Sequence, residues 1–122
     1  MKDIFKDVMG IEGVHGLMVI SNEGNVMISK FSPEFRDEEE RLSQINWEPF
    51  TIEMGNIKDA ELIYDTARFY IKKNENGFLI VIIGDNAPIS MVRLNCEILL
   101  PSLAKIQPAS KKLGKLLRKK IF

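Results

Sequence analysis

The sequence has few of the residues from which many functional sites are built. Cys96 is the only cysteine and His15 the only histidine, so one chain cannot form an internal disulfide or a multi-ligand zinc site. The longest apolar run, Phe78–Ile83, has six residues, whereas a bilayer-spanning helix needs about 20. The N-terminus shows no export signal, which predicts a cytoplasmic protein. We expect no cofactor, no metal and no catalytic site of its own.

Neither sign of charge is in excess. The 122 residues carry 17 basic and 17 acidic side chains and are 45% hydrophobic, a composition typical of one globular domain. The balance disfavours a basic nucleic-acid binder, and we expect no nucleic-acid partner. The charges are nevertheless separated, because residues 34–61 hold nine acids against three bases and residues 105–122 hold seven bases and no acid. We therefore divide the chain into a folded domain, residues 1–108, and a basic tail, residues 109–122.

Apolar periodicity and turn residues predict the order α-β-β-α-β-β-β-α. A short amphipathic helix ends at Gly10, and Gly24 supplies the positive φ that a tight hairpin turn requires. The sequence Ser32-Pro33-Glu34 suits the start of a central helix that runs to about Met54. The predicted strands are Gly16–Ser21, Asn25–Lys30, Ala60–Asp65, Arg68–Lys73 and Phe78–Ile83.

The strand Phe78–Ile83 is apolar at every position, so both of its faces must be covered and it should lie in the middle of the sheet. Asp85 or Asn86 is expected to cap the last helix, with Pro88 in its first turn. This helix should pack on the sheet through a stripe that comprises Ile89, Val92, Cys96, Leu99, Leu103 and Ile106.

The central helix is predicted to carry two apolar stripes. Because successive residues of a helix are rotated by about 100°, four apolar residues fall on one side, where they can pack on the chain's own sheet. This stripe comprises Phe35, Leu42, Ile45 and Ile52. The other lies on the opposite side and comprises Trp47, Phe50 and Met54. A second copy of the chain would cover this second stripe. Alternatively, Pro49 breaks the helix, the angular phase resets, and Trp47 and Phe50 turn into the domain's own core.

The order of elements and the segment Gly13–Gly24 resemble the Roadblock/dynein light chain family over roughly residues 1–106. Gly13, Val14, Gly16 and Gly24 occupy the family's pattern of Gly-Val-x-Gly, an apolar strand and a glycine turn. The resemblance implies an α+β, profilin-like sandwich: a five-stranded antiparallel sheet with the first and last helices on one face and the central helix on the other. It also implies homodimers in which central helices and edge strands meet. The candidate dimer or partner surface therefore comprises Ile45, Trp47, Phe50 and Met54.

Members of this family look like docking platforms and regulators for Ras-like small GTPases, and a bacterial type is similar to the gliding-motility GTPase-activating partner. The resemblance implies a non-enzymatic homodimer that modulates GTP hydrolysis or exchange by repositioning groups on the GTPase. Pro49 and the tail after Pro108 depart from the family pattern. The alternative is a PAS-like or profilin-like sensory or adaptor module that binds a small ligand or a protein, which an enclosed apolar cavity would favour.

Two charged segments remain. Asp37–Glu40 places four acids in the first turns of the central helix, where they fan out around the axis as a solvated helix start and can steer a basic partner. In the tail, leucines share one helical face and cations fill the remainder, so the tail can lie on an anionic membrane surface, fold along the acidic central helix or solubilise the chain. The cations expected to contact an anionic surface are Lys111, Lys112, Lys115, Arg118, Lys119 and Lys120.

Overall fold

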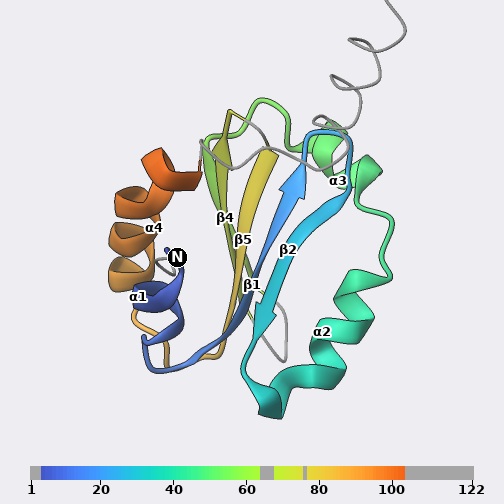
Figure 1. Cartoon of the computed structure of the whole chain (residues 1–122). Helices are drawn as coiled ribbons and strands as arrows, with labels where there is room; N and C mark the ends of the chain where they lie inside the picture. Colours follow the sequence, from blue (N-terminus) through green and yellow to red (C-terminus); the bar gives the residue numbers. More distant parts are fainter. Residues whose placement is uncertain (1–3, 64–67, 76, 104–122) are drawn as a thin grey trace, which may run out of the picture.

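A five-stranded antiparallel sheet lies between two layers of helices (Figure 1). The computed structural model describes residues 4–63, 68–75 and 77–103 of the chain. The strand order is β2-β1-β5-β4-β3, and every neighbouring pair is antiparallel. Helices α1 and α4 cover one face, and α2 and α3 cover the other (Figure 1). The predicted fold class is confirmed.

The predicted strands are present, with described boundaries that differ by one or two residues, and the predicted end of the third strand at Asp65 lies outside the described residues. The strands are β1 (Val14–Ser21), β2 (Val26–Phe31), β3 (Asp59–Ile63), β4 (Arg68–Asn74) and β5 (Gly77–Ile83). Strand β5 lies between β1 and β4, and all of its residues are buried, which confirms its central position. Apolar side chains from its two faces therefore enter two separate cores, one under each helical layer.

Two glycines of the family-like segment are required by the packing. Gly24 has a φ of 89° in the hairpin between β1 and β2, and a Cβ there would lie 2.5 Å from the backbone nitrogen of Glu48. A Cβ on Gly16 would lie 2.3 Å from the ring of Phe31 on the paired strand. The motif therefore serves the fold, since its glycines allow close approach of neighbouring segments.

The first helical layer consists of α1 (Lys6–Met9) and α4 (Ile89–Leu103). The predicted apolar stripe of α4 is confirmed for Val92, Cys96, Leu99 and Leu103, all of which are buried, whereas Ile106 lies outside the described residues. The prediction of its cap is wrong, because α4 begins at Ile89 and the residue before it is Pro88 rather than Asp85 or Asn86. The Pro88 carbonyl instead accepts hydrogen bonds from the amides of Met91 and Val92.

The second layer corrects the prediction of one continuous central helix. A short 3₁₀ turn η1 (Pro33–Phe35) leads into α2 (Arg36–Ser43), and a separate helix α3 (Glu48–Glu53) follows after a break. Pro49 lies in the first turn of α3, where its missing N–H removes no helical hydrogen bond. The angular phase of the second helix is therefore independent of the first, and the two predicted stripes do not continue across the break.

Candidate functional site on the outer face of the α2–α3 layer

The Trp47 side chain lies in the core, at the break between α2 and α3. Its side chain is 5% exposed, and its indole Nε1 donates a hydrogen bond to the Leu42 carbonyl oxygen at 3.0 Å. The indole meets the Phe50 ring edge-on with centroids 5.3 Å apart, and Phe50 meets Phe78 of β5 at 5.6 Å. Phe50 and Met54 are partly buried against the same core. The expectation that Trp47 needs a partner's cover is therefore wrong, and the alternative in which Trp47 and Phe50 turn into the core is confirmed. Phe50 and Met54 keep part of their surface exposed, so their place on a partner surface stays a prediction.

Two residues of the stripe that was predicted to pack on the sheet are exposed instead. Ile45 is 47% exposed in the break, and Ile52 is 73% exposed on α3. Only Leu42 of that first stripe is buried in the described core, and Phe35 is partly exposed. The apolar outer face of this layer is thus defined by Ile45 and Ile52, which we call the outer isoleucine face. Of the four residues predicted for the partner surface, Ile45 alone is exposed on the outside of this layer.

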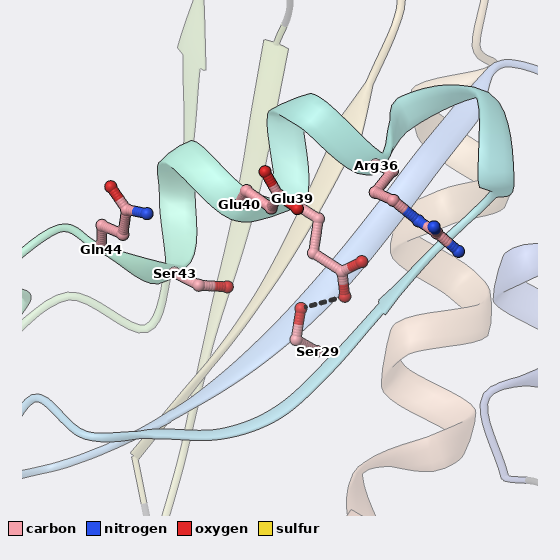
Figure 2. Close-up of a pocket in the computed structure, with 6 residues that line it drawn as sticks. All are labelled: Ser29, Arg36, Glu39, Glu40, Ser43 and Gln44. Carbon is pink, nitrogen blue, oxygen red and sulfur yellow. Dashed lines mark hydrogen bonds between the residues drawn. The ribbon is translucent and has the colours of Figure 1, made fainter.

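The acidic start of α2 is held to the sheet by two contacts. The Glu38 carboxylate lies 3.3 Å from His15 Nδ1, and the His15 ring stacks on Phe35 at 3.8 Å with an interplanar angle of 10°. Glu39 accepts a hydrogen bond of 2.6 Å from the Ser29 hydroxyl of β2 (Figure 2). His15 thus packs between the sheet and the start of α2. The four acids also fan out as predicted, since Glu38 and Glu39 take different partners and Asp37 and Glu40 face solvent.

Beside this contact lies an open hollow between α2 and β2. It has a volume of about 470 Å³, and α2 and its end contribute most of the lining (Figure 2). Its lining is polar, with carboxylates, a guanidinium, hydroxyls and an amide, and comprises Ser29, Arg36, Glu39, Glu40, Ser43 and Gln44. Such a rim suits charged or polar contacts beside the outer isoleucine face, in the way that a polar rim surrounds the apolar centre of a protein interface.

Strand β3 is one of the two edge strands of the sheet, the other being β2. Its five residues pair with β4 alone, so the opposite edge presents backbone N–H and C=O groups that no described strand takes up. Ile63 at its end is 73% exposed. An open edge with an exposed apolar residue is a ready template for a strand from another chain.

The two groups with a strongly raised pKa, Cys96 and Tyr70, are buried in the core rather than placed at these surfaces. Burial raises the pKa of the Cys96 thiol to about 12, so the thiol stays protonated at neutral pH. Burial, followed by the negative charge of Asp59, likewise raises the pKa of Tyr70 to about 12. Within residues 4–63, 68–75 and 77–103, no group of three or more histidine, cysteine or acidic side chains lies close enough to hold a metal.

The hollows on the described part of the chain bear on the ligand-binding alternative. Of four hollows on the described residues, the largest has a volume of about 780 Å³ and lies between α1 and the start of α4, open to solvent. Its lining mixes Lys6, Asp7, Glu12 and Asn86 with Met91 and Ile11. None of the four is an enclosed apolar chamber of the kind that favours a small-molecule sensor.

The basic tail, with its predicted contact residues Lys111, Lys112, Lys115, Arg118, Lys119 and Lys120, lies outside the described residues. Among the helices that are described, none combines the length and the apolar character needed to cross a bilayer. The expected anionic-surface contact therefore stays a prediction.

Comparison with known proteins identifies the fold. No protein-family model and no curated protein sequence matches this chain. Among solved structures, MglC from Myxococcus xanthus matches with a TM-score of 0.61 at 12% identity, over 84% of this chain and 98% of MglC. MglB in a tetrameric arrangement matches with a TM-score of 0.59 at 14% identity, over 84% of this chain and 83% of its own. A Roadblock/LC7 domain from Streptomyces avermitilis matches with a TM-score of 0.56 at 15% identity, over 80% of this chain and 88% of that domain. The chain therefore has the Roadblock/LC7 fold, as the resemblance predicted.

Proposed function

We propose that this chain is a homodimeric, non-enzymatic regulator or scaffold that binds a Ras-like small GTPase in the cytoplasm and modulates its GTP hydrolysis or exchange. The observation that carries the proposal is the outer isoleucine face, with Ile45 at 47% and Ile52 at 73% exposure on a layer that already covers its own sheet. The Roadblock/LC7 fold, shared with MglB and MglC, supports a role in a GTPase pathway.

The dimer is proposed to form through the outer isoleucine face and the β3 edge. Burying one isoleucine side chain contributes about 1.5 to 3 kcal/mol, and a twofold arrangement uses each residue twice. Antiparallel pairing of two β3 edges would take up their free backbone groups and join two sheets. The tetrameric arrangement of MglB supports self-association as a property of this fold.

A dimer of this kind offers the GTPase a wide composite surface rather than a catalytic group. Its polar rim is the acidic start of α2, where Asp37 and Glu40 face solvent and can attract a basic patch on the partner. Binding that favours one conformation of the switch loops shifts the GTPase toward it, which changes the rate of hydrolysis or exchange. The regulator then needs no nucleophile or metal of its own.

The experiment is a reconstitution with the full-length chain. Each Ras-like GTPase of the same organism is loaded with GTP, and phosphate release measures hydrolysis. It is also loaded with a fluorescent GDP analogue, whose release measures exchange. The mass of any complex is measured in both states. We expect one GTPase to form a complex and to change at least one of the two rates by tenfold or more. Absence of both a complex and a rate change with every such GTPase would overturn the proposal.

A pair of variants separates the interface from the fold. Ile52→Asp should abolish the rate change, since it puts a charge on the outer isoleucine face. Leu94→Asp is the matched control, because Leu94 is also an exposed apolar residue but lies on α4, across the sheet. Equal loss in both variants would show that the effect does not depend on the α2–α3 layer.

A further inference from the structure

The opposite side of the molecule carries an apolar stripe that the proposed function does not use. On α4, Met91, Leu94 and Ile98 are 51%, 56% and 65% exposed, and Pro101 is exposed one turn further on. The spacing of 3, 4 and 3 residues keeps all four on one side of the helix. The buried stripe of α4, which includes Val92 and Cys96, faces the sheet, so the exposed stripe faces away from it.

The shape of this stripe indicates a helical partner. Single exposed apolar residues are ordinary on protein surfaces, but four aligned at alternating intervals of three and four form the narrow seam typical of paired helices. Beside the seam, a hollow of about 160 Å³ opens between α1 and α4, with Ile4 and Asp7 on one wall and Ile98 and Ser102 on the other. A side chain from a second helix can enter this hollow as a knob enters a hole.

We infer that the occupant of the α4 seam is the chain's own C-terminal segment, residues 110–121. This segment has the matching pattern, because Leu113, Leu116, Leu117 and Ile121 share one face at helical spacing. It also starts in the right place, since α4 is described to Leu103 and 19 residues follow it. The inference is independent of the proposed GTPase function, which uses the other face of the sheet.

The length of the chain allows an antiparallel return along α4. Residues 104–109 provide a link of six residues, within the range of about 2 to 8 that joins neighbouring helices. The seam from Met91 to Pro101 is about 15 Å long, and a helix over residues 110–121 would be about 18 Å long. The tether also favours this occupant over a free partner, because a short link keeps the segment at a millimolar effective concentration beside α4.

Charge supports the same pairing. The tail has six cations between Lys111 and Lys120 and no acid. Acidic side chains border the seam: Glu97 is exposed on α4, where it also lies 3.6 Å from Lys72 Nζ, and Asp7 and Glu12 line the hollows beside α1 together with Lys6. The leucines would cover the seam while the cations reach the flanking carboxylates or solvent. The same leucines cannot then lie on a membrane, so docking on α4 and binding to an anionic surface exclude each other.

Disulfide trapping in the full-length chain tests the contact. Leu94→Cys combined with Leu117→Cys should form an intrachain disulfide on mild oxidation, at a rate that does not depend on protein concentration. Cys96 can stay in place, since burial raises its pKa to about 12 and leaves its thiol unreactive. The matched control is Gln44→Cys with Leu117→Cys, because Gln44 is exposed at the end of α2 on the other face of the sheet.

We expect the first pair to close at least tenfold faster than the control pair. Equal rates would overturn the inference, because the tail would then visit both faces alike. Predominantly interchain disulfides, seen as a doubled mass under denaturing conditions, would also overturn it and assign the seam to a second copy.

Amide hydrogen exchange supplies a second measurement that needs no new cysteine. Residues 110–121 should be protected in the wild-type chain, and Ile98→Asp should speed their exchange at least tenfold while leaving β5 protected. Ile52→Asp, with a comparable exposed isoleucine on α3, should leave tail exchange unchanged. A tail that exchanges at unfolded-chain rates alone but becomes protected on phosphatidylserine vesicles would overturn the inference and assign its leucines to the membrane.

Discussion

The indole Nε1 of Trp47 donates to the carbonyl oxygen of Leu42 at 3.0 Å, across the break that separates α2 from α3. Both residues are buried in the core on this face of the sheet. The Leu42 carbonyl also accepts from the Ile45 amide at 3.3 Å, so the indole adds a second hydrogen bond to a carbonyl near the end of α2 and is itself held inward. This contact is the reason that isoleucines, rather than the tryptophan, form the outer surface.

Trp47→Ala should destabilise the fold itself. The change removes a buried indole and its hydrogen bond and leaves a cavity, which costs about 3 to 5 kcal/mol in the free energy of unfolding. Urea unfolding followed by circular dichroism gives this quantity. The control Glu53→Ala, an exposed change at the end of α3, should stay within about 0.5 kcal/mol of the wild type. A Trp47→Ala protein that keeps wild-type stability and only changes its oligomeric mass would restore the original assignment of the indole to an interface.

Ile52→Asp should convert the proposed dimer into a folded monomer. The aspartate would bring two carboxylates into an apolar contact around the twofold axis, whereas the side chain is 73% exposed within one chain and contributes little to its core. Light scattering measures the mass, and circular dichroism measures the fold. Leu94→Asp should leave the mass unchanged. If the wild-type chain is a monomer at micromolar concentration, the outer isoleucine face does not self-associate and this prediction is wrong.

Gly24→Ala should weaken the packing of the hairpin against α3. At a φ of 89° an alanine is strained, and its Cβ would approach the Glu48 nitrogen to 2.5 Å, so we expect a loss of at least about 1 to 2 kcal/mol in the free energy of unfolding. Gly55→Ala is the matched control, since its Cβ would come no closer than 3.4 Å to the Thr51 carbonyl oxygen. Comparable urea midpoints for the two variants would contradict the close approach at Gly24.

Alkaline pH should destabilise the chain through Tyr70 and Cys96. The pKa of each is raised to about 12 in the folded state, from 10.0 and 9.0. The folded state therefore holds these protons more tightly than the unfolded state, and their contribution is fully present below pH 9 and is lost as the pH rises toward about 12. Urea midpoints measured between pH 8 and 11.5 should fall, and Tyr70→Phe should make that fall shallower. An unchanged slope in Tyr70→Phe would show that the hydroxyl does not take part.

Local sequence patterns determined most of the architecture. The apolar run of β5 requires cover on both faces, and the glycine at position 24 requires a turn of positive φ, so the central strand and the first hairpin follow from short-range chemistry. The buried stripe of α4 follows from spacing alone, because a single uninterrupted helix keeps its angular phase.

The assignment of the outer surface required the tertiary structure. Spacing places Ile45 and Ile52 together with Leu42 only if the helix is continuous, and the break before Pro49 removes that condition. Which side chains then turn inward depends on the space beside Phe78 on β5, which Phe50 fills next to the Trp47 indole and which no local pattern encodes. The sequence thus determined which residues of this region are apolar, and packing against the sheet decided which of them are left for a partner.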